Sequence, residues 1–325
     1  MINRRELLAL SALSALGALN PGAAAAQSWP SRSVRLVVPY PPGGTTDGTA
    51  RIVADWLART WGQPVVIENK PGQGTNIGAE TVARADPDGY TMFVAASSTA
   101  ANKNIYRTLR YDLVTDLAPV SRLVTFPLVF LVPASSPVKS IADLVAHARE
   151  RNGSLTYGTP AFAGLNHLTG ELFSRMANIK MTHVPYRGDA LAMTDLIAGR
   201  LDLQIAGTVQ LEQARAGQAR ALAVTTAERI PAAPDVPTVT ESGLPGFNVQ
   251  AWFALLVPAN VPADIVKKVN IDTVLALRDP TVKAKLEGIG VTVAPSTPEE
   301  LAGFIKAEIA KWEAVIREAG IRIEG

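Results

Sequence analysis

The chain has 325 residues, of which 47% are hydrophobic and 18% are charged, so it can bury a large core, and its length suggests two domains. It carries 31 basic and 29 acidic residues, and a net charge of +2 argues against nucleic acid or an anionic membrane surface as a partner. The absence of cysteine excludes disulfides, thiolate nucleophiles and cysteine-held zinc or iron–sulfur sites.

The first 26 residues have the order of segments that is typical of a secretory signal peptide. Residues 1–5 are basic, residues 7–19 are apolar but too few to cross a bilayer, which takes about 20 residues, and residues 23–26 form a small-residue cleavage site. A buried N-terminal helix is the alternative. We expect cleavage after Ala26 and a mature chain in the periplasm, exported by the Sec route or, given Arg4-Arg5, by the twin-arginine route.

Strands and helices alternate in the first block of the mature chain. A β-branched run predicts a strand at 34–38, which turns through Pro41-Pro42-Gly43-Gly44 into a helix that ends at Gly62. The block continues with a strand at 65–68, a helix at 77–85 and a strand at 90–95. This alternation predicts βαβ units on a parallel sheet.

The second and third blocks repeat the alternation. In the second block we expect strands at 128–132, 155–158, 181–184, 201–206 and 221–225, with helices at 141–153, 165–176, 190–198 and 211–216. The segment 226–248 is rich in Pro and Gly and is predicted to be a loop. In the third block we expect strands at 252–257 and 291–293, with helices at 264–277, 281–287 and 297–319.

Two apolar strands, at 128–132 and 252–257, bracket the middle block. This arrangement predicts one lobe inserted into another. Residues 27–127 and 251–325 would form lobe 1 and residues 128–250 lobe 2, with two strands as the hinge and a cleft between the lobes that closes on a small ligand. One continuous doubly wound sheet is the alternative.

Groups that carry catalysis are scarce. His147, His167 and His183 are the only histidines, and no two of them have metal-ligand spacing. The chain also lacks the local sequence signatures of serine hydrolases, P-loop nucleotide-binding proteins and dinucleotide-binding enzymes. We therefore expect no catalytic residue, no metal and no cofactor, and a protein that is not an enzyme.

Three loops of glycine and hydroxyl residues occur where a predicted strand gives way to a helix. They are residues 42–47, 97–99 and 158–164. Exposed backbone N–H groups at helix starts bind anions, and ligands of open α/β sheets bind at the carboxyl ends of strands. The three loops therefore predict an anion site shared by both lobes, although each loop by itself could be a simple turn.

Several segments together resemble one protein family. Pro39-Tyr40-Pro41-Pro42-Gly43-Gly44-Thr45-Thr46-Asp47 is similar to the first loop of the Bug-type, or TctC-like, substrate-binding proteins of tripartite tricarboxylate transporters. The further matches are residues 68–72, 76–79, 86–90, 183–188 and 234–238, so the resemblance covers essentially the whole mature chain.

The resemblance implies both a fold and a function. The fold is α/β, a type II-like periplasmic-binding-protein fold whose two lobes of mixed sheets flanked by helices move about a two-strand hinge, as a Venus flytrap does. The function is capture of a small organic carboxylate in the interlobe cleft and delivery to the membrane subunits of the transporter. A receptor that reports its ligand to a membrane sensor kinase is the alternative. We expect a monomer.

Two departures from the family pattern bear on the ligand. The segment 98–103 lacks the His and Pro that the family commonly has, and Ala161-Phe162-Ala163-Gly164 replaces a loop that is often Gly-Asn-Gly-Ser. Phe162 could support an apolar or aromatic part of a ligand, or it could fill the core of its lobe. The sequence leaves open whether the ligand is a dicarboxylate, a tricarboxylate, an aromatic acid or an amino acid.

The candidate ligand-binding residues come from both lobes. Lobe 1 would contribute Tyr40, Gly43, Gly44, Thr45, Thr46, Ser98 and Thr99, and lobe 2 would contribute Thr159, Ala161, Phe162, Gly164, His167, Tyr186, Arg187 and Asp202. Structural roles remain open for several of them: Tyr40 could merely cover the cleft, His167 could pack within its helix, and Arg187 could be solvated. Asp202 could position Arg187 or bind an amino group, and Asp47 is expected to be an N-cap.

Overall fold

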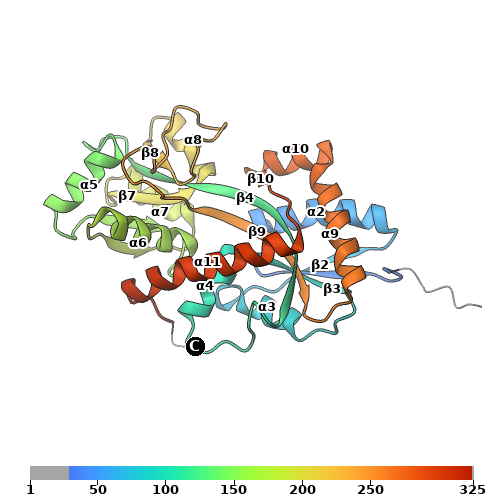
Figure 1. Cartoon of the computed structure of the whole chain (residues 1–325). Helices are drawn as coiled ribbons and strands as arrows, with labels where there is room; N and C mark the ends of the chain where they lie inside the picture. The colour runs from blue at the N-terminus through green and yellow to red at the C-terminus, as the bar shows by residue number, and fades with distance from the viewer. Residues whose placement is uncertain (1–28, 324–325) are drawn as a thin grey trace, which may run out of the picture.

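The strand β4 (Leu117–Pro133) runs through the whole molecule and organises its sheet. The computed structural model describes residues 29–323, so the expected signal peptide lies outside the described residues. In the described part the strand order is β2-β1-β3-β9-β4-β7-β5-β6, and β8 and β10 pair with β4 off this path. Helices cover the sheet along its length (Figure 1), and no described helix is long and apolar enough to cross a membrane.

The first half of the molecule is built around three parallel strands. Its strands are β1 (Val34–Val38), β2 (Val65–Asn69), β3 (Thr91–Ala96), β9 (Gln250–Pro258) and the short β10 (Thr292–Val293). Its helices are α2 (Thr45–Trp61), α3 (Asn76–Ala83), α4 (Ser97–Ile105), α9 (Ala263–Arg278), α10 (Pro280–Gly288) and α11 (Pro298–Ala319), with a 3₁₀ turn at Gln73–Thr75. Strand β9 pairs antiparallel with β3 and with residues 117–127 of β4.

The second half is built on the remaining part of β4. Its strands are β5 (Thr156–Thr159), β6 (Thr182–Pro185), β7 (Leu203–Gly207) and β8 (Ala219–Val224). Its helices are α5 (Ile141–Glu150), α6 (Leu165–Ala177), α7 (Asp189–Ile197) and α8 (Leu211–Arg215), with a 3₁₀ turn at Thr208–Gln210. Strands β7 and β8 pair antiparallel with residues 128–133 of β4, whereas β5 pairs parallel with β6 and β7.

Strand β1 packs against apolar clusters on both of its faces. Val34, Leu36 and Val38 belong to one apolar cluster, and Val37, between them, belongs to another on the opposite face, as alternation along a strand requires. Helix α2 covers the first face because its apolar residues recur at helical spacing, and it ends at Gly62, whose φ of 63° few other residues adopt readily.

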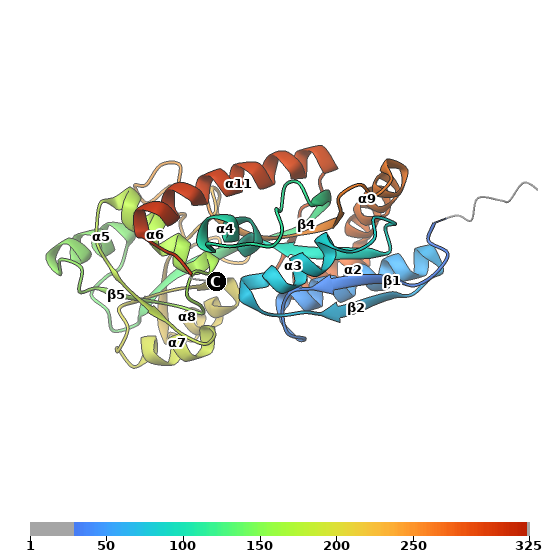
Figure 2. The ribbon, with the colours of Figure 1, turned by 90° about the horizontal axis from the view of Figure 1, so that it is seen from below.

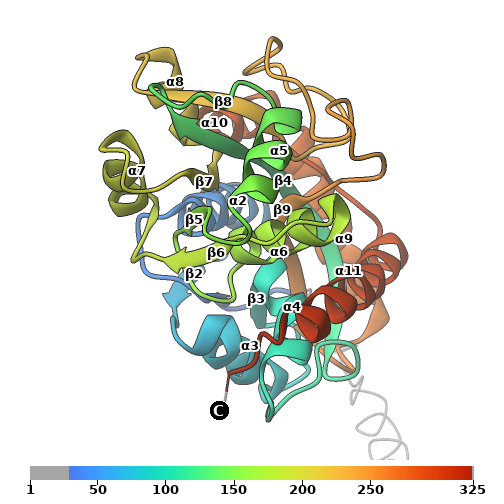
Figure 3. The ribbon, with the colours of Figure 1, turned by 90° about the vertical axis from the view of Figure 1, so that its left-hand side faces the viewer.

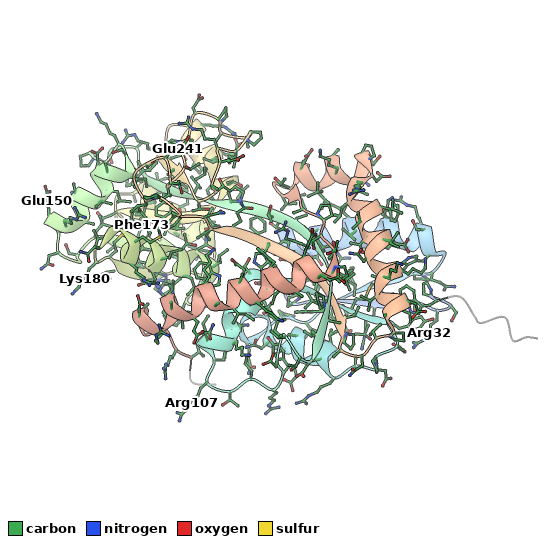
Figure 4. The ribbon with its side chains drawn as sticks, in the orientation of Figure 1. Arg32, Arg107, Glu150, Phe173, Lys180 and Glu241 are labelled. Atoms are coloured by element: carbon green, nitrogen blue, oxygen red, sulfur yellow. The ribbon has the colours of Figure 1, made fainter. Side chains whose placement is uncertain are left out.

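A third cluster fills the second half. Phe173 lies at its centre, fully buried, whereas Glu150, Lys180 and Glu241 project from the outer surface of this half (Figure 4). The cluster also takes in Trp312 and Val315 from the C-terminal part of α11.

Helix α11 therefore packs against both halves. Leu301 and Ile305 near its beginning lie in a cluster with Trp252 of β9, and its last turns contact the second half. Figure 2 shows α11 extending along both halves on one side of the molecule. Seen from the second half, α11 lies beside α4 and α6 (Figure 3), and Arg175 of α6 forms an ion pair of 2.7 Å with Glu318 of α11.

Most of the expected elements are present within one or two residues of their predicted bounds, and residues 226–248 form turns without a helix or strand of their own. The main difference is β4, which begins at Leu117 rather than at Leu128. Pro119 and Pro127 lie within it and do not end the strand, because the pairing with β9 shifts register between Pro119 and Ser121 and again between Arg122 and Val124.

Candidate functional site

The carboxyl ends of two sets of strands converge on the same stretch of β4. Ala96 at the end of β3 is opposite Phe253 of β9, which in turn is opposite Val124 of β4. From the other side of β4, Gly207 at the end of β7 is opposite Leu128. Because β3 runs with β4 and β7 runs against it, the two sets of strands head toward each other at this junction. The segments that follow β1, β3, β5, β6 and β7 therefore begin on the side of the sheet where the two halves join.

The loop between β1 and α2 is fixed by the carboxylate of Asp47. One oxygen accepts the backbone N–H of Gly43 at 3.0 Å and Nε of Arg51 at 2.8 Å, and the other accepts Nδ2 of Asn69 at 2.9 Å. The bond from Arg51 is the largest cause that lowers the pKa of Asp47 to about 2, so this carboxylate stays ionised. Asp47 is the third residue of α2, and Gly44, not Asp47 as expected, is the N-cap.

The first two loops are joined to each other. The hydroxyl groups of Tyr40 and Ser98 are 2.9 Å apart, and the backbone oxygen of Tyr40 accepts Nδ2 of Asn69 at 2.9 Å. Burial raises the pKa of Tyr40, which therefore remains a neutral hydroxyl. Thr99 is buried behind this surface, where its hydroxyl bonds Thr75 at 3.0 Å.

Four helices at the junction begin without a side chain that bonds their first N–H groups. They are α2, α4, α6 and α7, whose N-caps are Gly44, Ala96, Gly164 and Gly188. In contrast α5, α10 and α11, which begin away from the junction, are capped by Ser140, Asp279 and Thr297. Helices α3, α8 and α9 also begin without a side-chain cap, at Thr75, Gln210 and Pro262. Free N–H groups and the positive end of the helix dipole favour a bound anion.

Gly43, Gly44 and Thr45 are exposed at the beginning of α2, whereas Thr46 is buried. Gly43 has a φ of 90°, so the loop needs glycine there. Gly44 has an ordinary φ of −83°, and no atom lies within 4 Å of a Cβ built on it. The space before α2 is therefore open, which suits the approach of a ligand to the backbone.

The loops after β5 and β6 are also joined to each other. The hydroxyl of Thr159 donates to the backbone oxygen of Ala161 at 3.0 Å and lies 2.7 Å from Nε2 of His183, which therefore donates to it. The backbone N–H of Tyr186 donates to the oxygen of Thr159 at 2.9 Å, and that of Gly188 to the oxygen of Pro160 at 3.1 Å. These bonds hold the two helix starts, at Gly164 and Gly188, next to each other.

Aromatic side chains stack beneath the β5–α6 loop. The rings of His167 and His183 are parallel within 10° with centroids 3.7 Å apart, Tyr157 lies 5.0 Å from His183, and Phe162 lies 5.1 Å from His167. Burial, then the neighbouring His167, lowers the pKa of His183 to about 4, so this imidazole is neutral near pH 7. The hydroxyl of Tyr157 donates to Glu171, whose other neighbour is Nε2 of His167 at 3.7 Å.

The remaining predicted residues of the second half have different surroundings. Ala161 and Arg187 are exposed in the two loops, and Tyr186 is half-buried, with its hydroxyl donating to Asp195 at 2.8 Å. Burial raises the pKa of Tyr186 to about 12. Asp202 precedes the amino end of β7, away from the junction, and both of its oxygens are engaged there by Arg151 and Thr156.

The structure places fourteen of the fifteen candidates in or beside the segments at the junction, and Asp202 away from them. Asn69, Tyr157, Glu171 and His183 contact these segments and were not among the candidates. His183 lies two residues before Pro185, and only the parallel pairing of its strand with β5 shows that it is opposite Tyr157. No group of three metal-ligating side chains occurs among residues 29–323.

Comparison with known proteins identifies relatives over the whole chain. The family described as TctC, tripartite tricarboxylate transporter family receptor, matches residues 49–321. Protein BugT of Bordetella pertussis is 32% identical, with 99% of this chain and 100% of that protein covered. A protein encoded between tcbD and tcbE in Pseudomonas sp. strain P51 is 37% identical, with 98% and 95% covered.

Three solved structures show the same fold. A protein from R. palustris solved with adipate is 39% identical, with a TM-score of 0.79 and 91% of this chain and 100% of that chain covered. MatC from Rhodopseudomonas palustris, solved with bound malate, is 33% identical, with a TM-score of 0.74 and 89% and 100% covered. The periplasmic binding protein BugD is 30% identical, with a TM-score of 0.76 and 91% of this chain and 100% of that chain covered. The predicted periplasmic-binding-protein fold is confirmed.

Proposed function

Since the chain belongs to the TctC family, the receptors of tripartite tricarboxylate transporters, we propose that it captures a small carboxylate-containing solute in a cleft between its lobes. It would do so in the periplasm after removal of residues 1–26, as a monomer, and would deliver the solute to the membrane subunits of such a transporter. The lobes are residues 27–127 with 251–325, and residues 128–250. Capture is by lobe closure, without covalent chemistry.

The observation that carries this proposal is the set of uncapped helix starts at the junction. Helices α2 and α4 point their free N–H groups there from the first half, and α6 and α7 do so from the second. A carboxylate can accept hydrogen bonds from several of these N–H groups at once, and its negative charge is stabilised by the positive end of each helix dipole. The adipate and malate in two of the solved relatives are both carboxylates, which agrees with this chemistry.

The lobe boundary is supported by the pairing along β4. Pro127 is opposite Gln250 of β9, and the next residue, Leu128, is opposite Gly207 of β7. The chain thus enters lobe 2 after Pro127 and leaves it at Gln250, and these two residues are paired across β4 and β9. Two crossings side by side provide the hinge that closure requires.

The carboxylate would lie in front of Gly44 and Thr45, with Ser98 and the hydroxyl of Tyr40 beside it. Gly164 and Tyr186 face it from lobe 2, while Thr159 is buried and holds the loop behind them. Arg187, exposed in the β6–α7 loop, is a cation available to a second acidic group. Asp47 and Thr99 act behind this surface by holding the loops, through the bonds described above.

A substitution series at Gly44 tests the proposal. Gly44→Asp places a fixed carboxylate where the solute's carboxylate is expected, Gly44→Asn adds a neutral cap of the same shape, and Gly44→Ala adds only a Cβ into open space. By calorimetry with adipate, malate and benzoate, we expect affinity to fall at least about 10-fold with Asp, less with Asn, and to stay within about 3-fold with Ala. Unchanged affinity with Asp, or no binding of any carboxylate by the parent chain, would overturn the proposal.

A further inference from the structure

Large apolar side chains are exposed in the segments that follow three neighbouring strands of the second half. Phe162 lies in the loop after β5, Leu191 in the first turn of α7 after β6, and Val209 in the 3₁₀ turn after β7, and their exposed fractions are 50%, 56% and 73%. All three segments begin at the end of the sheet that faces the junction. The segments after β1 and β3 instead have glycine, threonine and serine at their helix starts. Exposed apolar side chains at one end of a sheet suit contact with an apolar part of a ligand.

Phe162 is held in place although half of it is exposed. Its ring packs on His167 at 5.1 Å, and His167 in turn lies parallel to His183. Tyr157 and His167, which are almost completely buried, already fill the space below. The ring is thus a fixed platform above the core rather than a part of the core.

The backbone beside Phe162 has an unusual conformation that supports this position. Ala163 has a φ of 56°, in the left-handed region that alanine rarely adopts, and its N–H donates to Nδ1 of His167 at 3.0 Å. Strain of this kind persists where neighbouring contacts enforce it, commonly at ligand sites. Here it turns the chain so that Phe162 stands out from the loop just before α6 begins.

The surface around this ring is suited to a flat, uncharged group. His183 is neutral, and Glu171 is engaged below by Tyr157 and His167. Among the loop residues that follow β5, β6 and β7, the charged ones are Arg187 and Asp189, and Asp189 is partly buried and accepts Nε2 of Gln204. A conjugated ring gains more than a saturated one of the same size from contact with a fixed aromatic face, because offset and edge-on ring arrangements add to burial.

We propose that the solute is an aromatic carboxylate, which places its carboxylate at the starts of α2 and α4 and its ring on Phe162. This inference rests on the proposed carboxylate-binding function and names the class of its ligand. Leu191 and Val209 extend the apolar surface for the edge of the ring. A second acidic group, where the solute has one, would meet Arg187.

Matched acids test the inference on the unmodified chain from Gln27 onward. Benzoate is compared with cyclohexanecarboxylate, and benzene-1,4-dicarboxylate with trans-cyclohexane-1,4-dicarboxylate, so that the members of each pair differ in whether the ring is aromatic or saturated. Adipate is the acyclic reference. By calorimetry we expect the aromatic member of at least one pair to bind about 10-fold or more tightly than its saturated partner.

Two variants test whether the ring of Phe162 causes the preference for aromatic acids. Phe162→Leu keeps an apolar side chain but removes the ring, and it should reduce the aromatic preference to less than about 3-fold while adipate binding changes little. Leu275→Ala truncates a side chain of the same 50% exposure on α9, outside the junction, and should leave every affinity unchanged. Thermal unfolding of each variant shows whether it is folded.

The outcomes separate the inference from the function on which it rests. Equal affinity for both members of each pair, or tighter binding of adipate, overturns the aromatic assignment and leaves the carboxylate-binding proposal standing. An aromatic preference that survives in Phe162→Leu shows that another surface holds the ring, and it overturns the role of Phe162. If the parent chain binds none of these acids, the proposed function fails together with the inference.

Discussion

At the scale of the residue, the most consequential charged group of the site is Asp47. Its side chain is only 4% exposed, and its two oxygens accept bonds from Gly43, Arg51 and Asn69. It therefore shapes the loop on which a ligand would rest and has little capacity left to touch the ligand. Asn69 connects this network to Tyr40, so one carboxylate positions both ends of the loop.

Asp47→Asn should destabilise the protein because one amide oxygen cannot replace the charged acceptor of these bonds. We expect the free energy of unfolding to fall by about 1 to 2 kcal/mol, as measured by urea denaturation near pH 7. Asp55→Asn on the same helix removes an exposed i,i+4 partner of Arg59 and should cost less than about 0.5 kcal/mol. Equal costs at both positions would contradict the role given to Asp47.

His183 should make stability depend on pH. Its pKa of about 4 in the folded chain lies below its ordinary value of 6.5, chiefly through burial, so the unfolded chain takes up the proton first as the pH falls. The stability of the folded chain is therefore not reduced by His183 above pH 6.5, and it falls as the pH is lowered toward 4. With its partial exposure allowed for, we expect a loss of about 1 kcal/mol between pH 7 and pH 5.

Substitution of His183 by Gln retains a donor for Thr159 but removes the titrating group. Urea denaturation at pH 7, 6 and 5 should therefore show a shallower loss of stability in His183→Gln than in the parent chain. Parallel curves for the two proteins would mean that His183 is not the responsible group.

At the scale of the element, three helices that begin away from the junction have side-chain caps, whereas the four that begin at the junction have none on their first helical N–H groups. Thr297 caps α11 through a reciprocal bond pair with Glu300, and Ser140 caps α5. In α4 the hydroxyl of Thr99 accepts the N–H of the N-cap residue Ala96 itself, and in α2, α4, α6 and α7 no side chain of the N-cap residue bonds the N–H groups that follow. The ligand is proposed to complete the caps of these four helices.

Thr297→Ala and Ser140→Ala should each lower the free energy of unfolding by about 1 kcal/mol, because each leaves N–H groups of a first turn without a partner. Thermal and urea denaturation measure both losses. A Thr45→Ala variant, at a helix start without a side-chain cap, should change stability much less. A comparable loss at Thr45 would contradict the distinction between the two kinds of helix.

The elements could be predicted from sequence where the signal is local. The strand Val34–Val38 is a β-branched run ended by Pro39, and it was predicted with its observed bounds. The first part of β4 could not be predicted in this way, because Pro119 and Pro127 argue against a strand until the register shifts are seen. Of the three predicted loops, residues 97–99 are instead the first turn of α4, and residues 45–47 are the first turn of α2.

The aromatic stack could not be predicted because its members come together only in the sheet. Tyr157 and His183 are in register across β5 and β6, and His167 reaches them from α6. The sequence also left two environments open for Phe162, and only its 50% exposure shows that it is outside the core. Contacts between distant residues depend on register and helix rotation, which periodicity alone does not define.

At the scale of the whole molecule, the two halves share too much structure to unfold separately. Strand β4 is continuous through both, and α11 packs on both. Glu308 of α11, which is buried, accepts the indole N–H groups of Trp252 and Trp312, each at 3.2 Å, and so connects α11 to β9. Unfolding of one half alone would expose apolar surface of the other half to water.

We therefore expect a single cooperative unfolding transition. Calorimetry should give equal calorimetric and van't Hoff enthalpies, and the Thr297→Ala and Ser140→Ala variants, from different halves, should both shift the whole transition. Two resolved transitions, each moved by only one of the variants, would show that the lobes are independent.

The bridge made by α11 also limits how the halves can move. Helix α11 packs on both halves, next to a strand that runs through both. We therefore expect the halves to rotate about these two elements rather than to separate from each other. Figure 2 shows α11 along one side of the molecule and α7 with β2 toward the other. The proposed cleft would then have one mouth, on the side away from α11. Solute would enter and leave through that mouth, and a transporter that accepts the solute would have to dock around its rim.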